Sequence, residues 1–302
     1  MLEETVSRLD FLKPADIYIA INAKHLDLVK KLCPQIPETN IIIEPALRDT
    51  APCIGLAAAI IEKNHPGEVM VVIYADHLIQ NKEEFEKKLH LAEELCQKEN
   101  TLNIIEVPAK EPNIHFGYVK LGKEITPDVY LLDSFKEKPD IETAKEFVKS
   151  GNYLWNTGLY VWKAATLLEK YQQLKPEMYS ALTAMAEKND FSAYPELEKI
   201  SIDYAIMEKV EPSEVRIIKA DLGWSDIGNW EAIWQHLSSS PDNNITRGDT
   251  RLLDCEGCLI YGDQEKQIAA IGLKDIIIID TKEGLIVCQK SDSKRIKEIQ
   301  ES

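Results

Sequence analysis

The sequence has no apolar run long enough to cross a membrane and no excess of positive charge. Its 302 residues carry 35 basic and 51 acidic side chains, a formal charge of −16. A membrane-spanning helix needs about 20 apolar residues, and the acidic start of the chain is unlike a signal peptide. We therefore expect a soluble, cytoplasmic protein with no membrane partner. So negative a chain also excludes a nucleic-acid partner, but a nucleotide substrate needs only a few local donors.

Closely spaced cysteines are almost absent. Of six cysteines, only Cys255 and Cys258 lie near each other in sequence. A zinc site would need a second pair or suitably spaced histidines, and the chain has neither. Glu256-Gly257, between two apolar runs, favours a turn over a metal or redox site.

Residues 68–77 are the most informative stretch. They form a nearly continuous apolar run, rich in β-branched residues, that ends in Asp76 and His77. Such a run predicts a strand buried on both faces. Ligands of open α/β sheets bind beyond the carboxyl ends of the strands, where the carboxylate of Asp76 can hold a hard cation that also contacts phosphate. A helix cap is the alternative interpretation of Asp76.

Apolar strands and helices alternate along the first part of the chain, which predicts an α/β domain with a mostly parallel sheet. We expect strands at 16–21, 40–43 and 102–105, with helices at 24–33, 53–63 and 82–98. Further short strands (116–119, 129–132, 158–162, 215–218) and helices (165–174, 177–187, 202–209) follow, and a helix ends at Leu237.

A polar, turn-rich segment at 238–244 is the best domain boundary. Beyond it, five short apolar runs recur at close intervals between 251 and 288, and a charged helix at 291–299 closes the chain. Short strands at even spacing predict a small all-β coil or solenoid. The expected domains are therefore 1–240 and 245–302.

Three acids follow strands or lie in turns between glycines and aromatic residues: Asp76, Glu137 and Asp226. Two carboxylates that meet at one point would bind Mg²⁺. Glu137 and Lys138 place a hydroxyl acceptor beside a phosphate partner, and Asn156 adds an amide. Each group taken singly has an ordinary structural explanation, but together they favour a site on one α/β sheet.

An ordered set of motifs carries a resemblance that runs from near residue 5 to the end of the chain. The motifs are Glu44-Pro45-Ala46-Leu47-Arg48-Asp49-Thr50-Ala51-Pro52, Ala75-Asp76-His77, Phe135-Lys136-Glu137-Lys138-Pro139, Tyr153-Leu154-Trp155-Asn156-Thr157-Gly158, Ser201-Ile202-Asp203-Tyr204 through Glu208, and Gly223-Trp224-Ser225-Asp226-Ile227-Gly228. By this set the sequence resembles the mannose-1-phosphate guanylyltransferases, also called GDP-mannose pyrophosphorylases. The resemblance implies a Rossmann-like nucleotidyltransferase domain followed by a short left-handed β-helix.

The resemblance also implies a reaction, in which GTP and mannose 1-phosphate give GDP-mannose and pyrophosphate. Positioning and charge neutralisation do most of the work in such transfers. By motif, Asp76 and Asp226 would hold Mg²⁺, and Lys138 would meet the sugar phosphate. The nucleotide residues would be Glu44, Pro45, Thr50 and Asp76, and the sugar residues Gly117, Glu137 and Asn156. Asp203 either contacts ligand or supports the fold.

The sequence departs from the family at two places. It has no glycine-rich loop of the form Gly-Gly-x-Gly-Thr-Arg, which cradles the triphosphate in the family. About 30 residues, part of one βαβ unit, are expected before the helix with which Met1 aligns. Asp49 stands where the family usually has asparagine, which puts the base contact there in doubt.

Three hypotheses follow. The chain is a guanylyltransferase that is truncated and weakly active or inactive, a regulatory subunit that binds a sugar nucleotide without turnover, or a related pyrophosphorylase with another sugar or base. The sequence leaves a homo-oligomer open.

Overall fold

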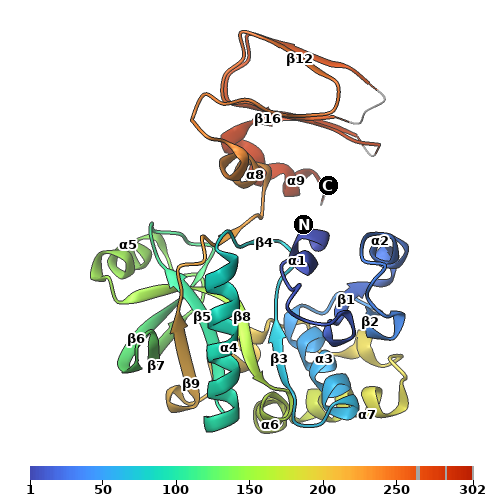
Figure 1. The fold of residues 1–302 in the computed structure, drawn as a ribbon, viewed down its shortest axis with the longest axis vertical. Helices are drawn as coiled ribbons and strands as arrows, with labels where there is room; N and C mark the ends of the chain where they lie inside the picture. Colours follow the sequence, from blue (N-terminus) through green and yellow to red (C-terminus); the bar gives the residue numbers. More distant parts are fainter. Residues whose placement is uncertain (263–265, 283, 301–302) are drawn as a thin grey trace. The chain divides into compact units, whose positions relative to one another are not determined.

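The computed structural model describes residues 1–262, 266–282 and 284–300. Two compact units divide the chain. The first comprises residues 1–75 and 79–224, and the second comprises residues 76–78 and those from 225 onward (Figure 1). Within the described residues, no helix combines the length and the apolar composition that crossing a membrane requires.

The first unit is built on a six-stranded sheet with the order β3-β8-β5-β9-β7-β6. These strands are β3 (Val69–Val72), β5 (Leu102–Pro108), β6 (Gly117–Thr126), β7 (Val129–Lys136), β8 (Tyr153–Lys163) and β9 (Val215–Lys219). The α/β class is confirmed, but the sheet is more mixed than simple alternation suggests. β5 and β9 pair in parallel, whereas β8 lies antiparallel between β3 and β5. β8 also pairs antiparallel with β6, so it runs against all three of its neighbouring strands.

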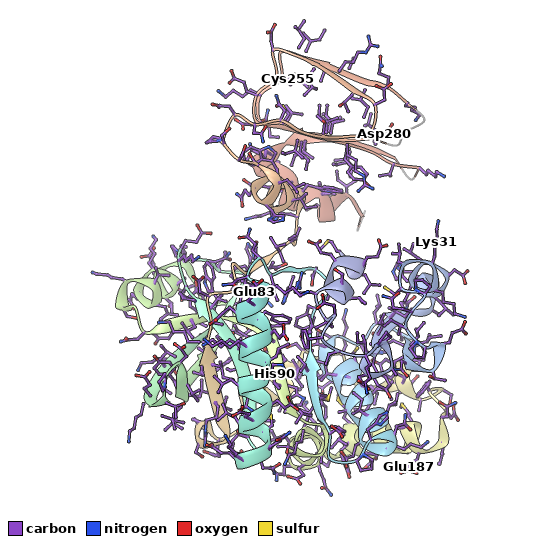
Figure 2. The ribbon with its side chains drawn as sticks, in the orientation of Figure 1. Lys31, Glu83, His90, Glu187, Cys255 and Asp280 are labelled. Atoms are coloured by element: carbon purple, nitrogen blue, oxygen red, sulfur yellow. The ribbon has the colours of Figure 1, made fainter. Side chains whose placement is uncertain are left out.

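Helices cover both faces of this sheet. α3 (Thr50–Asn64), α6 (Ala164–Leu174) and α7 (Pro176–Lys188) contribute to one hydrophobic cluster, which includes Tyr160 and Trp162 of β8. α1 (Leu2–Ser7), α2 (Leu26–Leu32), α4 (Lys82–Glu99) and α5 (Ile141–Ser150) contribute to the other, which includes Leu159 and Val161 of the same strand. Because β8 is covered on both sides, its residues from Leu159 to Trp162 are all aliphatic or aromatic and fully buried. Charged side chains such as Lys31, Glu83 and Glu187 lie on the surface (Figure 2).

A separate pair of parallel strands, β1 (Ile19–Asn22) and β2 (Ile41–Glu44), completes the first unit. Within the part of the chain described, β1 pairs only with β2, and β3 pairs only with β8. Nevertheless, side chains of β1 and β3 belong to the same hydrophobic cluster, with Ile19 and Ile21 on one side and Val69 and Val71 on the other. Two strand edges that share a core therefore have no strand between them.

The second unit is a small β coil. β11 (Ile245–Arg247), β13 (Leu259–Tyr261) and β15 (Ile276–Asp280) stack in parallel, and β16 (Leu285–Gln289) closes that sheet antiparallel to β15. β12 (Thr250–Leu253) and β14 (Ile268–Ile271) form a second parallel layer. The predicted short strands and terminal helix are thus confirmed, the latter as a 3₁₀ turn, Lys290–Arg295, followed by α9 (Ile296–Gln300).

α8 (Trp230–Leu237) packs within this second unit, although the sequence assigned it to the first domain. The buried ring of Trp234 contacts Leu259, Ile277 and Ile279. The ammonium group of Lys290 lies 3.2 Å from the centre of that ring. The bounds 1–240 and 245–302 stay a prediction.

Two local expectations were wrong. No helix was expected at 141–150, but α5 forms there because Asp140 caps it by accepting a hydrogen bond from the N–H of Thr143, and Gly151 ends it at a φ of +71°. The helix expected at 202–209 is a short π-helix, Asp203–Met207. Single π-turns of this kind often lie at functional sites.

Candidate functional site

Three of the predicted sugar-binding residues meet in the first unit. Gly117 on β6 lies directly opposite Asn156 on β8. A Cβ atom added to Gly117 would overlap Oε2 of Glu137 and would lie 3.1 Å from Cβ of Asn156. The missing side chain of Gly117 is therefore what lets the Glu137 carboxylate approach the two strands. We expected Gly117 to make room for a sugar ring, and here the space is used by Glu137.

Glu137 presents a buried acceptor oxygen. Its side chain is 8 % exposed, and Oε1 forms an ion pair of 2.9 Å with the ammonium group of Lys138, while Oε2 has no hydrogen-bond partner within the described residues. Burial and the negative charge of Asp203 raise the pKa of Glu137, against the opposing effect of Lys138. Lys138 itself is mostly exposed and holds a left-handed backbone, φ +44°. Oε2 of Glu137 can therefore accept a hydrogen bond from a hydroxyl group, and the ammonium group of Lys138 beside it is accessible to an anion.

Asp203 joins this site through hydrogen bonds to two neighbours. Its Oδ1 accepts a bond of 2.5 Å from the hydroxyl of Tyr160 and one of 3.0 Å from Nδ2 of Asn156. Oδ1 of Asn156 accepts from the N–H of Gly158 at 3.1 Å. The orientation of the Asn156 amide is therefore fixed from both ends. Asp203 therefore holds Asn156 in place, and a direct contact between Asp203 and ligand stays a prediction.

The predicted nucleotide residues lie at the end of β2 and the start of α3. The carboxylate of Glu44 accepts a bond of 2.6 Å from the hydroxyl of Tyr194. Pro45 is exposed. The Oγ1 atom of Thr50 accepts from the N–H of Ile202 at 2.9 Å, and Ile202 directly precedes Asp203. This hydrogen bond therefore connects the nucleotide segment, at Thr50, to the residue next to Asp203 of the sugar cluster.

The two predicted metal ligands are brought together in the second unit, although 150 positions separate them in sequence. Asp226 lies in β10 (Ser225–Asp226), which pairs antiparallel with β4 (His77–Leu78) and sets Asp226 opposite His77. The N–H of Ile227 donates to the carbonyl oxygen of Asp76 at 3.1 Å. Asp76 precedes β4 in a turn, so strand alternation does not set the direction of its side chain. That one cation reaches both carboxylates stays a prediction.

The donor set suits a hard cation only in part. Within the described residues, no group of three or more acidic, histidine or cysteine side chains is arranged to hold a metal ion. Two neighbouring carboxylates fit Mg²⁺ when phosphate oxygens and water complete the shell, which is how this ion is commonly bound. Asp76 and Asp226 are therefore compatible with Mg²⁺ that arrives with a nucleotide.

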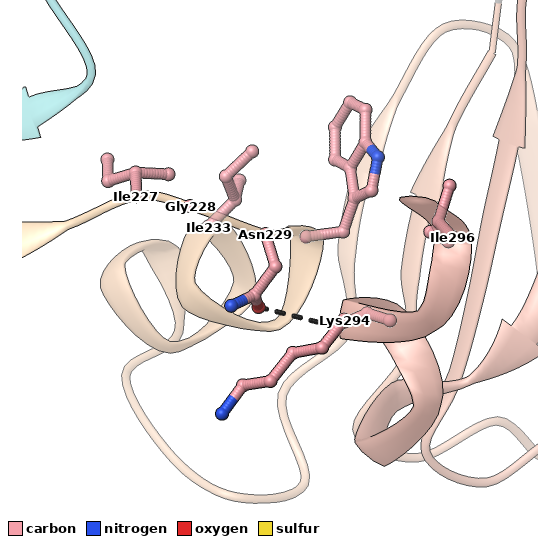
Figure 3. Close-up of a pocket in the computed structure, with 8 residues that line it drawn as sticks. Ile227, Gly228, Asn229, Ile233, Lys294 and Ile296 are labelled. Atoms are coloured by element: carbon pink, nitrogen blue, oxygen red, sulfur yellow. Dashed lines mark hydrogen bonds between the residues drawn. The ribbon is translucent and has the colours of Figure 1, made fainter. Parts of the chain in front are cut away.

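A cavity of about 240 Å³ follows Asp226 in the second unit, and its walls come from the start of α8 and from the last turns of the chain. Figure 3 shows Asn229 and Lys294 beside it. Asn229 caps α8, since its Oδ1 accepts from the N–H of Ala232, and it also accepts from the hydroxyl of Ser293. None of the predicted site residues lines this cavity. The cavity therefore lies beside the N-terminal cap of α8 and is not part of the candidate site.

Sequence reasoning missed three residues that support the candidate site: Glu106 and Tyr160 at the sugar cluster, and Tyr194, which donates to Glu44. Glu106 is an acid inside the apolar strand β5 and is fully buried. Such a residue costs free energy unless it is paired, so an acid in the run 102–108 was a usable signal. The two tyrosines gave no signal, because an aromatic residue in an apolar element is usually part of a core.

Comparisons with known proteins identify the family of the chain. The family model described as nucleotidyl transferase matches residues 1–242, and a model described as a mannose-phosphate isomerase/GMP-like β-helix domain matches residues 248–302. The chain is 32% identical to mannose-1-phosphate guanylyltransferase of Klebsiella pneumoniae, over 98% of this chain and 65% of that protein. The enzyme of the same name from Escherichia coli gives the same identity and coverage.

A solved structure has the same fold over nearly the whole chain. The crystal structure of mannose-1-phosphate geranyltransferase from Thermus thermophilus matches with a TM-score of 0.86 and 27% identity, over 99% of this chain and 88% of the other. The chain spans just under two thirds of the length of the curated relatives that it matches.

Proposed function

The chain belongs to the nucleotidyl transferase family, and we propose that it acts on GTP and mannose 1-phosphate to give GDP-mannose and pyrophosphate. The observation that carries this proposal is the convergence of Gly117, Glu137 and Asn156 beside Lys138. A carboxylate, an amide and a lysine together suit a ligand that has several hydroxyl groups and one phosphate. The names of the relatives support mannose 1-phosphate as that ligand.

In the proposed reaction, an oxygen of the sugar phosphate attacks the α-phosphorus of GTP. A new P–O bond forms there, the bond to the bridging oxygen breaks, and pyrophosphate leaves with the electron pair. Glu137 and Asn156 hold the sugar hydroxyl groups, and Lys138 holds the attacking phosphate. Glu44, Pro45 and Thr50 contact the base. Most of the rate gain in such a transfer comes from holding the two reactants in line.

Asp76 and Asp226 would hold Mg²⁺ in this proposal. The ion would neutralise phosphate charge as pyrophosphate departs. The support is the backbone pairing that makes the two residues neighbours. The proposal includes a cytoplasmic location, and it needs neither a nucleic-acid nor a membrane partner.

The test measures binding and turnover separately on the 302-residue chain. Titration calorimetry with mannose 1-phosphate, and with GTP and Mg²⁺, reports the two sites, and a pyrophosphate-release assay reports the reaction. We expect binding of mannose 1-phosphate, with weaker binding of glucose 1-phosphate. A chain that binds neither sugar phosphate contradicts the proposal.

A second candidate function is binding without turnover. It is favoured because Glu137, Lys138 and Asn156 lie together in the first unit and can hold a sugar phosphate whether or not transfer follows. Mannose 1-phosphate binding with negligible pyrophosphate release would support this second function.

A further inference from the structure

Glu106 is the most deeply buried acid of the first unit, and the proposed reaction gives it no role. Its side chain has no exposed surface, although it lies on β5 among apolar residues. Oε2 accepts a bond of 2.6 Å from the N–H of Thr157, and Oε1 has no hydrogen-bond partner within the described residues. A buried carboxyl group with one satisfied oxygen needs an explanation.

The surrounding backbone supplies that explanation. β5 and β8 pair in register up to Ile105 and Leu159, and again from Val107 and Trp155. One residue of β5, Glu106, therefore faces the three residues 156–158 of β8, which form a bulge. A bulge leaves backbone groups without their ladder partners. The N–H of Thr157 is such a group, and the side chain of Glu106 takes the place of the missing acceptor.

Two further hydrogen bonds hold the bulge, one to β5 and one within β8. The hydroxyl of Thr157 donates to the carbonyl oxygen of Ile105 at 2.5 Å and accepts from the N–H of Leu159 at 3.1 Å. Gly158 has a φ of +71°, and a Cβ atom there would overlap Cε2 of Tyr74. The bulge thus has a single conformation, and Asn156 is its first residue.

The charge around Glu106 favours the protonated form. Burial raises the pKa of Glu106 well above its usual value, and the N–H of Thr157 only partly opposes this effect. The negative charges of Asp203 and Glu137 raise it further. A protonated Glu106 can still accept the hydrogen bond from the N–H of Thr157 through its carbonyl oxygen. Protonation also avoids a third negative charge beside Asp203 and Glu137.

We propose that Glu106 is a positioning residue of the sugar-phosphate site, which holds the 156–158 bulge in shape through its bond to the N–H of Thr157 and so orients the Asn156 amide toward the ligand. This inference rests on the proposed function for the identity of the ligand. It predicts a role that a glutamine can fill and a leucine cannot, because glutamine keeps the acceptor oxygen and leucine has none.

The experiment compares E106Q, E106L and the parent chain, with E146L on the exposed surface of α5 as the control for loss of a glutamate. Calorimetric titration gives the Kd for mannose 1-phosphate and for GTP with Mg²⁺. We expect E106L to weaken mannose 1-phosphate binding at least tenfold and GTP binding less than twofold. E106Q and E146L should stay within twofold of the parent chain for both ligands.

A second measurement tests the positioning without any ligand. Hydrogen exchange of a peptide that covers residues 153–160 reports the N–H of Thr157. We expect at least tenfold faster exchange there in E106L, parent-like exchange in E106Q, and unchanged exchange in β9. Unchanged exchange in E106L would overturn the proposal, as would equal weakening of both ligands or failure of E106Q to restore sugar-phosphate binding. If the parent chain binds no mannose 1-phosphate, the proposed function fails while the exchange result still decides the role of Glu106.

Discussion

The hydroxyl of Tyr160 donates a hydrogen bond of 2.5 Å to Oδ1 of Asp203, and this oxygen also receives the amide of Asn156. Tyr160 is fully buried in β8, with its ring stacked on Trp162 at 4.9 Å. Burial and the charge of Asp203 raise the pKa of Tyr160 well above its usual value, so its proton stays in place. The Asn156 amide is therefore held by a chain of two hydrogen bonds that begins at the buried hydroxyl of Tyr160.

Y160F should weaken mannose 1-phosphate binding by about 1–3 kcal/mol, since a bond to a charged group is lost while the ring stays. Titration calorimetry measures the change. Y179F, at a half-buried tyrosine on α7, is the matched control and should bind as the parent chain does. Equal affinities for Y160F and the parent chain would mean that Asp203 holds Asn156 without help.

G117A should damage the same site in a different way. The added Cβ would overlap Oε2 of Glu137, a contact that forces the carboxylate to move. We expect at least a tenfold loss of mannose 1-phosphate affinity, about 1.4 kcal/mol or more, with a smaller effect on GTP. Calorimetry with both ligands separates the two. Full affinity in G117A would show that Glu137 does not contact the sugar.

The raised pKa of Glu106 predicts a pH-dependent stability. In the unfolded chain this acid ionises near its ordinary pKa, whereas in the folded chain it stays protonated to a higher pH. Its contribution is therefore fully present below the unfolded pKa and is lost as the pH rises toward the folded pKa, at up to about 1.4 kcal/mol per pH unit.

E106Q removes this titration, so the variant should gain stability relative to the parent chain as the pH rises from about 5 to about 8. Urea unfolding at several pH values gives the difference in free energy of unfolding. E146Q, at an exposed glutamate, should show no such trend. A difference between E106Q and the parent chain that is constant across this range would mean that Glu106 is ionised in the folded protein.

The strands and most helices could be predicted from the sequence because their apolar residues recur with a clear helical or strand spacing. Residues 53–63 are apolar almost all round and form the buried α3, and the short runs after residue 245 form the β coil. The site residues Glu137, Lys138 and Asn156 could be named because their motifs are specific. α5 was missed although Ile141, Ala144, Phe147 and Val148 recur at helical spacing and Asp140 is a suitable cap.

Other features depend on contacts that no local pattern encodes. That Glu106 faces a bulge follows from the register of β5 against β8, which is set by pairing far apart in sequence. That Gly117 admits Glu137 depends on a cross-strand position. The motif of Asp203 marked it as important, but only its partners, Tyr160 and Asn156, reveal how it acts.

D226N should abolish Mg²⁺-dependent nucleotide binding with little loss of stability. Asp226 pairs with His77, and the N–H of Ile227 donates to the carbonyl oxygen of Asp76, so the backbones of the two acids are neighbours. A neutral amide is a much weaker ligand for a hard cation than a carboxylate. Titration of GTP with and without Mg²⁺, together with thermal unfolding, measures both effects. D242N, at an exposed acid after α8, is the control. An unchanged response to Mg²⁺ in D226N would remove this residue from the proposed metal site.

The last prediction concerns the stability of the β coil as a fragment. Residues 245–302 alone lack α8, whose Trp234 covers the buried side chains Leu259, Ile277 and Ile279. So small a core is marginal below about 70 residues, and loss of a buried tryptophan costs about 3–5 kcal/mol. We therefore expect fragment 245–302 to be unfolded and fragment 225–302 to unfold cooperatively, as measured by circular dichroism during heating. W234A in the longer fragment should abolish the transition, whereas a stable 245–302 fragment would show that the coil needs no support from α8.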